Sequence, residues 1–335
     1  MLPGDFIAMK LTDNITTSAS ALSEGIFWDF RTNSISKDVL NYYGFDEAIF
    51  PTIQDVFSSH GLLSKHIAEN LSLSPNILVS YKAGDQPNNA LSLNVLQPGE
   101  VAATAGTSGV IYGVGDTLGY DKQSRVNSFA HVNHTAQNTR IGTLLCINGT
   151  GIANSFTKRI LASDKSYYTI NEEAKAIAIG SQGLQVLPFG NGAERIFGNK
   201  IVGAHYKNLD FNLHTQAHIF RAVQEGIAFA FRYGLDIMRE NGMQTTVIRS
   251  GKANLFLSDV FAGAFVNATS VPVELYNCDG SVGAALGAGI GASIFASEKE
   301  AFNNMKAMQL IEPNAVEAYD DYYLEWKESL EKQLV

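Results

Sequence analysis

Residues 100–114 read EVAATAGTSGVIYGV, in which two β-rich runs flank a turn with glycine at both ends. The pattern predicts a β-hairpin whose turn is Gly106, Thr107, Ser108 and Gly109. Glycine allows positive φ and leaves neighbouring amides uncovered by a Cβ, and the two hydroxyls add donors, so the turn can hold a phosphate group. Ordinary hairpins use the same residues, and no Gly-Lys-Ser/Thr sequence follows that would make this a Walker A loop.

Strand-like and helix-like segments alternate after the hairpin. Residues 140–147, 183–189, 244–249 and 271–275 predict strands, while residues 151–162, 255–267 and the segment from about Ser281 predict helices. The strongest helix is predicted over residues 215–240, where apolar residues recur at every fourth position: Ile219, Val223, Ile227, Phe231 and Leu235. Residues 298–335 predict a charged helical tail anchored by Trp326. The alternation is typical of a mixed α/β domain.

The beginning of the chain lacks this alternation of strands and helices. Short helices and loops are predicted over residues 1–75. Apolar spacing indicates helices over residues 6–11, 53–57 and 63–71. Ser36 can cap another helix, which Gly44 closes. Residues 76–81 form a β-rich run that ends just before Gly84 and Asp85, so a further strand is expected there.

Asp85 is the first candidate for chemistry. A carboxylate at the end of a strand lies where α/β proteins commonly place their active sites. There Asp85 could take a proton from a substrate hydroxyl as a general base, and Gln86 could orient the same substrate. The alternative is structural, because Asp85 can also cap a helix that has Pro87 in its first turn.

Other segments give weaker signals. Residues 249–254 join a predicted strand to a predicted helix, where small residues let a ligand approach the backbone, although a plain turn fits equally well. Small residues over 279–288 favour tight helix packing. Glu194 and Arg195 are a candidate ion pair, with a solvated turn as the simpler interpretation. His131 and His134 have no third ligand nearby in sequence, so a metal site is not expected there.

Composition narrows the class of protein. The 335 residues are 45% hydrophobic, enough for two packed domains, and the net charge of −9 argues against nucleic-acid or anionic-membrane partners. Cys146 and Cys278 are expected to be free thiols. The N-terminus lacks a basic start and an apolar core, and no run is long enough to span a bilayer, so a cytoplasmic location is expected.

Taken in order, the motifs resemble the FGGY family of carbohydrate kinases, and within it the xylulose kinases. The similarity covers nearly the whole chain. It is carried by Leu2-Pro3-Gly4-Asp5-Phe6, Gly84-Asp85-Gln86, Gly106-Thr107-Ser108-Gly109, Leu187-Pro188-Phe189 with Glu194-Arg195, Arg221-Ala222 with Glu225-Gly226, Ser250-Gly251-Lys252-Ala253, and Gly283-Ala284-Ala285.

The resemblance implies an α/β structure with the actin-like ATPase (ribonuclease H-like) fold. Residues 1–92 would be the C-terminal remnant of the family's sugar-binding N-terminal domain. Residues 93–335 would be the complete ATP-binding C-terminal domain with its charged helical tail.

The resemblance also implies a reaction: transfer of the γ-phosphate of ATP to a ketose hydroxyl, with D-xylulose giving D-xylulose 5-phosphate. Asp85 would be the catalytic base and would bind the sugar together with Gln86. ATP phosphates would be bound by Gly106, Thr107, Ser108 and Gly109, and adenosine by Gly251, Lys252, Ala253 and Asn254. Mg²⁺ would be needed, with no metal ligand in this chain, and the resemblance allows a homodimer. Two alternatives stay open: a truncated nucleotide-binding module without catalysis, and an FGGY kinase for another sugar or polyol such as ribulose or glycerol.

The sequence departs from the family pattern at three places. Ser250 and Lys252 replace glycines of the adenosine motif, and Ser18 stands where aspartate is common. The Asp-x-Gly-Thr motif, which in the family helps to hold Mg²⁺ and the γ-phosphate, does not occur. We therefore expect Met1 to be an internal methionine of a longer protein and the isolated chain to be a poor kinase.

Overall fold

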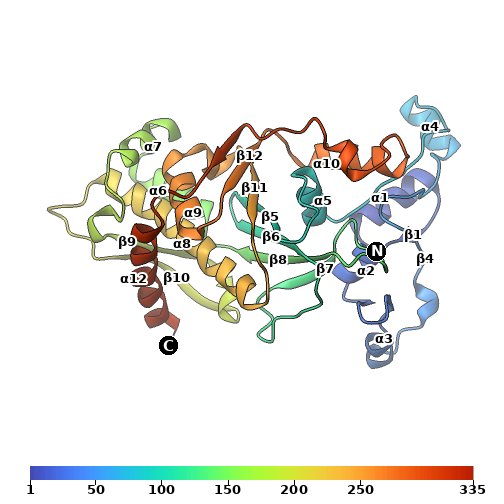
Figure 1. Cartoon of the computed structure of the whole chain (residues 1–335), viewed down its shortest axis with the longest axis horizontal. Coiled ribbons are helices and arrows are strands. Elements are labelled where there is room, and N and C mark those ends of the chain that lie inside the picture. The colour runs from blue at the N-terminus through green and yellow to red at the C-terminus, as the bar shows by residue number, and fades with distance from the viewer. Residues whose placement is uncertain (335) are drawn as a thin grey trace.

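The computed structural model describes residues 1–334, and its centre is a seven-stranded mixed sheet (Figure 1). The strand order is β13-β12-β11-β5-β6-β8-β7. β11 runs parallel to β5 and β12, whereas β6 runs antiparallel to β5 and β8. In chain order the strands are β5 (Glu100–Ala105), β6 (Gly109–Gly115), β7 (Asn127–Ala130), β8 (Ile141–Ile147), β11 (Val247–Gly251), β12 (Val273–Tyr276) and β13 (Gln309–Ile311). The predicted hairpin and three of the other predicted strands are confirmed here.

The two faces of the sheet bury alternate side chains of β5. Val101 and Ala103 belong to the large core formed with α8 (Gln216–Glu240) and α9 (Asp259–Thr269). Ala102 belongs to a smaller core on the other face, next to α5 (Asp85–Ser92). This is the alternation expected of a strand covered on both faces. The predicted apolar stripe of α8 is confirmed, because four of its five residues are buried in the large core and the fifth, Ile219, packs against that core.

The remaining segments of the large body lie around this sheet. They are α6 (Gly151–Leu161), α7 (Tyr167–Lys175), β9 (Gln185–Glu194), β10 (Lys200–Lys207), α10 (Gly280–Gly291), α11 (Glu298–Ala301) and α12 (Val316–Leu334), with 3₁₀ turns at Ser181–Gly183, Arg195–Phe197 and Asn254–Leu257. β9 and β10 form a separate antiparallel ribbon. Trp326 of α12 is fully buried, and its Nε1 donates to the Val186 carbonyl at 2.8 Å, so the predicted anchor of the tail is confirmed.

The N-terminal lobe is built from small pieces. They are α1 (Pro3–Thr12), β1 (Thr16–Thr17), α2 (Ala19–Glu24), β2 (Trp28–Asp29), β3 (Ser34–Ile35), α3 (Lys37–Tyr43), a 3₁₀ turn at Glu47–Ile49, β4 (Thr52–Ile53) and α4 (Lys65–Leu71). The cap of α3 is confirmed, since Ser36 Oγ accepts from the Val39 N–H and Gly44 has φ +69°.

Two predictions for this lobe are wrong. Residues 53–57 are not helical, because Thr52 and Ile53 pair in parallel with β1 and the segment continues extended. Residues 76–81 form no strand, and only the isolated bridges Phe57–Tyr81 and Leu62–Leu78 connect them to their neighbours.

Helix α10 joins the N-terminal lobe to the body, as Figure 1 shows beside α5. A Cβ on Gly283 would lie 2.3 Å from Ser92 Oγ, and one on Gly291 would lie 1.8 Å from the Ser80 carbonyl oxygen. Only glycine allows this approach, so the predicted tight packing of the helix is confirmed. No helix within residues 1–334 is both long and apolar enough to cross a membrane.

Candidate active site

The candidate site lies at the edge of the sheet where the parallel strands β5, β11 and β12 end. The turn at 106–108 follows β5, and residues 252–254 follow β11. Ligands of open α/β sheets commonly bind outside the carboxyl ends of such strands. A cavity of about 370 Å³ opens at this edge. It is lined by Ala105, Gly106, Thr107, Gly151, Asn154, Ser155, Tyr167, Asn171, Asn254, Leu255, Leu257 and Ser258.

The cavity brings together parts of two predicted motifs. A Cβ on Gly106 would lie 3.7 Å from Asn254 Nδ2, so the hairpin turn and the loop after β11 face each other at close range. One cavity is therefore lined by three of the predicted site residues, Gly106, Thr107 and Asn254. Ser108, Gly109, Gly251, Lys252 and Ala253 do not line it.

The expectation that the glycines of the turn have positive φ is wrong. Neither Gly106 nor Gly109 has positive φ. Gly109 is required by packing, because a Cβ there would lie 2.6 Å from Phe231 Cζ and 2.7 Å from Thr150 Cγ2. The side chain of Lys252 points to β13, where its Nζ donates to Gln309 Oε1 at 3.1 Å. Asn254 has φ +53°, the left-handed conformation that asparagine tolerates.

The start of α6 forms a wall of the cavity. The Ile152 N–H donates to the Thr107 carbonyl at 3.0 Å, and a Cβ on Gly151 would lie 2.0 Å from the Gly106 carbonyl oxygen. The hairpin turn and the first turn of α6 are therefore in direct backbone contact. The sequence predicted a helix over residues 151–162 but not its contact with the hairpin turn, so this wall was missed.

Glu194 fixes the loop that leads into α6. Its carboxylate accepts from the N–H groups of Asn148 at 2.9 Å and Gly149 at 2.8 Å, and the residue is fully buried. Burial raises the pKa of Glu194, while the two backbone bonds oppose the rise. The expected solvated turn is therefore wrong at Glu194. Arg195 instead donates to Asn127 Oδ1 and to the carbonyls of Ser124 and Val126.

Asn154 is a polar residue of the cavity that sequence analysis missed. It is only 6% exposed, and its Oδ1 has no hydrogen-bond partner among the described residues. A buried acceptor without a partner is costly unless a ligand or water satisfies it. A lone asparagine within a predicted helix gives no signal for such a role, because its neighbours in space come from other parts of the chain.

Asp85 begins α5 and is exposed. Gly84, not Asp85, occupies the N-cap position, so the alternative of Asp85 as the cap is wrong. The Asp85 carboxylate accepts from the Gln86 N–H at 2.9 Å and from Gln86 Nε2 at 3.1 Å. Gln86 therefore contacts Asp85 directly. The sequence predicted only that the two residues bind the same substrate.

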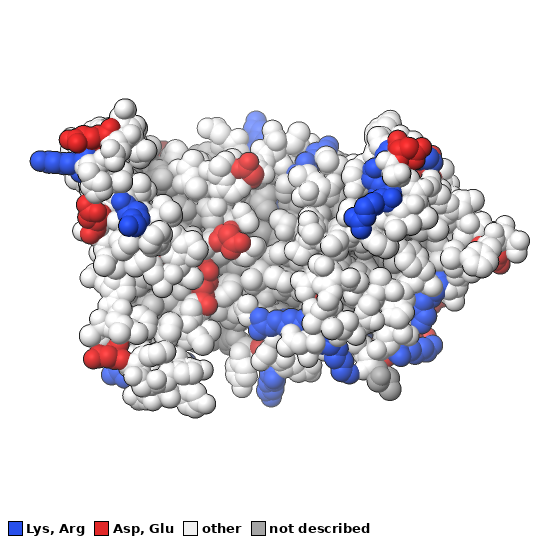
Figure 2. Space-filling view, turned by 180° about the vertical axis from the view of Figure 1, so that it is seen from behind, with Lys and Arg blue, Asp and Glu red and all other residues white. Residues whose placement is uncertain are grey.

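The charge of Asp85 affects the pKa of Cys146, a residue at the same end of the sheet. Burial raises the pKa of the Cys146 thiol, Arg195 opposes the rise, and the charges of Asp85 and Glu194 add to it. Cys146 lies opposite Val110, next to the hairpin turn. The charge of Asp85 therefore influences Cys146, at the end of β8 from which the α6 loop departs. Figure 2 shows acidic side chains in the hollow between the N-terminal lobe and the body.

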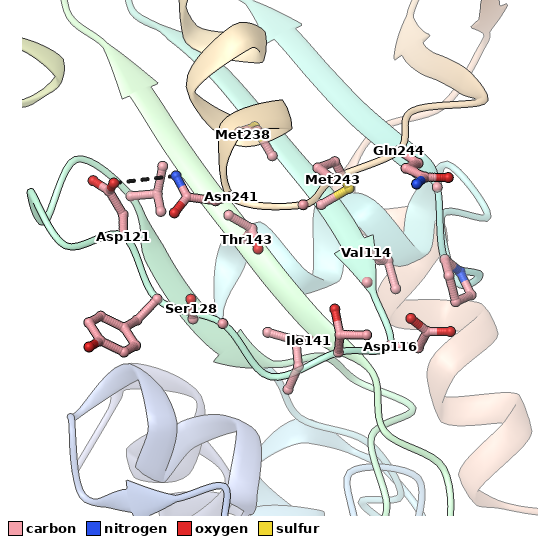
Figure 3. Close-up of a pocket in the computed structure, with 18 of the residues that line it drawn as sticks. Val114, Asp116, Asp121, Ser128, Ile141, Thr143, Met238, Asn241, Met243 and Gln244 are labelled. Carbon is pink, nitrogen blue, oxygen red and sulfur yellow. Dashed lines mark hydrogen bonds between the residues drawn. The ribbon is translucent and has the colours of Figure 1, made fainter.

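A second cavity, of about 410 Å³, lies at the opposite end of β6 (Figure 3). Its lining includes Val114, Asp116, Thr143 and Met243. Since β6 runs from Gly109 at the candidate site to Gly115 in this cavity, the two cavities lie at opposite edges of the sheet. Both cysteines are free, as expected, and residues 1–334 contain no group of three or more His, Cys, Asp or Glu that could hold a metal ion.

Comparison with known proteins shows similarity to sugar kinases. A xylulose kinase of Staphylococcus xylosus is 26% identical over 314 residues, which are 91% of this chain and 62% of that protein. The chain is therefore similar to xylulose kinases over most of its length. No family model matches it. The chain spans less than two thirds of the length of this kinase relative.

Solved structures of such kinases share the fold. The chain superposes on a xylulose kinase of Rhodospirillum rubrum with TM-score 0.87 at 22% identity, over 98% of this chain and 66% of that one. It superposes on Plasmodium falciparum glycerol kinase with ADP with TM-score 0.85 at 19% identity, over 99% of this chain and 66% of that one. The expected actin-like ATPase fold is confirmed.

Proposed function

We propose that this chain is the ATP-binding portion of a sugar kinase that transfers the γ-phosphate of ATP to a hydroxyl of a ketose, with D-xylulose as the acceptor. The main support is the cavity at the sheet edge, where the Thr107 turn, the start of α6 and Asn254 meet. Similarity to a xylulose kinase supports the acceptor. Residues 1–92 would then be the end of the sugar-binding domain, and residues 93–335 the ATP-binding domain.

Asp85 is the proposed general base. It would accept the proton of the sugar hydroxyl while that oxygen forms a bond to the γ-phosphorus and the bond between this phosphorus and the ADP oxygen breaks. Charge on the transferring group is stabilised mainly by positioned donors in phosphoryl transfer. Thr107 and the backbone N–H groups of residues 106–109 are the donors proposed for the phosphates, and Gln86 would help to orient the sugar.

The adenosine is proposed to contact residues 251–254, with Asn254 closest to the cavity and Lys252 contributing only its backbone. Asn154, whose Oδ1 has no partner, would complete the polar lining. Tyr167, Leu255 and Leu257 give the cavity the apolar surface that a base ring needs.

The lining of the candidate cavity does not fit a magnesium ion held by protein side chains. The cavity lining contains hydroxyl, amide and backbone groups but no Asp, Glu, His or Cys. Mg²⁺ prefers carboxylate and phosphate oxygens, so these residues do not fit a protein-held ion. When present with ATP, the ion would neutralise phosphate charge.

A coupled assay of ADP release tests the proposal. The full chain is incubated with MgATP and, separately, D-xylulose, D-ribulose or glycerol, and we expect release that is slow, because the isolated chain is expected to be a poor kinase, but that depends on D-xylulose. Asp85→Asn should lower turnover by about 10²- to 10⁴-fold, with ATP binding retained. Asp38→Asn, at an exposed position in the first turn of α3, should leave turnover unchanged. ADP release that is independent of any acceptor, or a fully active Asp85→Asn variant, would contradict the proposal.

A nucleotide-binding module without catalysis is the second candidate. The observation that favours it is that the candidate nucleotide cavity is lined by no carboxylate that could take part in the chemistry. Calorimetry would then detect ADP binding that Asn154→Ala weakens, while no acceptor supports ADP release in the coupled assay.

A further inference from the structure

Glu24 lies directly against the turn that carries Asp85, although the two residues are far apart in sequence. A Cβ on Gly84 would lie 2.0 Å from Glu24 Oε1 and 2.6 Å from its Cδ and Oε2. Gly84 has φ −67°, a conformation open to every residue, so its backbone does not require glycine. The Glu24 carboxyl, at the end of α2, therefore occupies the space that a side chain at position 84 would need.

The surroundings of this carboxyl favour its neutral form. Its Oε1 is buried and has no hydrogen-bond partner among residues 1–334. Burial raises the pKa of Glu24 to about 7, and the charges of Asp85 and then Asp5 add to the rise. A carboxyl of this kind remains largely protonated below neutral pH.

The other ionisable groups near Glu24 leave Asp85 as its main charged neighbour. From α1, Asp5 is held in an ion pair with Lys82, whose Nζ lies 2.6 Å from Asp5 Oδ1. From β6, Tyr112 has a raised pKa, chiefly because of burial and next because of Glu24. The Tyr112 hydroxyl bonds His131 Nδ1 at 3.0 Å, and burial lowers the pKa of His131 to about 3, so that imidazole is neutral.

We propose that Glu24 and Asp85 form a divided carboxyl pair, in which Glu24 positions the Gly84–Asp85 turn and Asp85 accepts the hydroxyl proton. Pairs of titratable groups with environments that separate their ionisation mark the division of acid and base roles in active sites. Glu24 is a positioning residue here, since it acts through Gly84 and exchanges no proton with the sugar. This inference rests on the proposed function for the role of Asp85.

Carboxyl ¹³C NMR of the full chain tests the electrostatic part without any enzymatic reaction. Spectra of glutamate-labelled protein are recorded across pH, and Glu24→Gln assigns the Glu24 signal. We expect a Glu24 pKa near 7 that Asp85→Asn moves toward the ordinary value of 4.5 and that Asp38→Asn leaves in place. The proposed pair is contradicted if the Glu24 signal titrates near 4.5 in the wild-type chain, or if Asp85→Asn does not change the Glu24 pKa.

A double-mutant cycle tests the contact itself. Gly84→Ala should lower the melting temperature in the wild-type background, because the new methyl group meets the Glu24 carboxyl. In the Glu24→Ala background the same substitution should cost much less. Equal losses in both backgrounds would show that Glu24 does not fill this space, and would contradict the proposal.

Kinetics test the positioning role. Glu24→Ala should lower kcat on the order of tenfold or more, because Asp85 loses its support, with the KM for ATP unchanged. Glu24→Gln should retain more activity than Glu24→Ala at pH 6. Its rate relative to wild type should rise from pH 6 to pH 8.5, because only the wild-type side chain becomes charged and repels Asp85 and the triphosphate. If the ratio of the Glu24→Gln rate to the wild-type rate does not change with pH, the proposed positioning role of Glu24 is contradicted.

The two proposals can fail separately. If no acceptor supports ADP release but the Glu24 pKa still responds to Asp85→Asn, the proposed kinase function is contradicted and the pair is supported. If ADP release depends on D-xylulose and on Asp85 but not on Glu24, the kinase stands and the pair is contradicted.

Discussion

The two walls of the proposed site are built in different ways. The cavity wall consists of loops that leave a large sheet, and direct backbone contacts such as Gly151 against Gly106 hold it. The Asp85 wall has no such sheet behind it, since isolated bridges precede it and small helices surround it. Buried ionisable side chains hold that wall: Lys82 with Asp5, and Glu24 against Gly84. The shape of the cavity therefore depends on backbone packing, and the position of Asp85 depends on a few side chains.

Among the variants that distinguish the two walls, Lys82→Met is expected to have the largest effect on the free energy of unfolding. Lys82 and Asp5 are 5% and 6% exposed at their side chains, and Lys82 also donates to Thr16 Oγ1 at 3.0 Å. Removing one partner leaves a buried unpaired charge, which costs about 3–5 kcal/mol of unfolding free energy. Urea unfolding of the variant, followed by fluorescence, gives this value.

The matched control is Lys175→Met. Lys175 pairs with Asp259 at 2.8 Å, but the two side chains are 54% and 71% exposed, so no measurable loss is expected. Equal losses for both lysines would show that the buried pair has no special part in holding the N-terminal lobe.

The difference between local contacts and contacts of distant segments also explains which elements the sequence could predict. The cap of α3, the apolar stripe of α8 and the hairpin depend on residues that are neighbours in sequence, and all were predicted. Residues 53–57 were predicted as a helix because Ile53, Val56 and Phe57 have helical spacing. Pairing of Thr52 and Ile53 with β1 overrides that local preference.

The site was predictable only where one short motif supplies it. Thr107 and Asn254 were expected to bind parts of one nucleotide because of the family resemblance, and both line one cavity. Asn154 and Glu24 could not be found in this way, because their importance comes from contacts with segments far away in the chain. Glu24 is 60 positions before Gly84, and no spacing rule connects them.

On the cavity wall, Gly151→Ala should have the second largest effect. Its Cβ would lie 2.0 Å from the Gly106 carbonyl oxygen, so the backbone must move, at a cost of about 1–3 kcal/mol. Nucleotide affinity should fall as well, because the hairpin turn moves with it. Thermal unfolding and calorimetry with ADP measure the two effects.

Gly263→Ala provides the comparison for that variant. Gly263 lies within α9, and a Cβ there would meet nothing within 4 Å. Alanine should therefore stabilise the helix by about 0.5–1 kcal/mol. If Gly151→Ala is equally harmless, the contact between α6 and the hairpin turn does not fix the cavity.

Asn154→Ala is expected to affect binding and not stability. Its Oδ1 has no partner to lose in the free protein, so the melting temperature should stay within about a degree or rise slightly. ADP affinity should fall by about 5- to 20-fold, the value of one hydrogen bond made to the ligand. Calorimetry measures this, with exposed Asn303→Ala as the unaffected control. Unchanged affinity would exclude Asn154 from the nucleotide site.

The final comparison is a pH dependence confined to the Asp85 wall. The Glu24 carboxyl has a folded pKa near 7 against an ordinary value of 4.5, so at intermediate pH the unfolded chain releases a proton that the folded chain keeps. Stability from this group is therefore lost as pH rises from 4.5, and the loss is complete above 7. Glutamine does not titrate, so the melting temperature of Glu24→Gln minus that of the wild type should increase from pH 5 to pH 8. Contributions common to both proteins, such as that of neutral His131, cancel in this difference. A difference that stays constant across this range would mean that Glu24 ionises as an ordinary surface carboxyl, and the Asp85 wall would then depend on Lys82 and Asp5 alone.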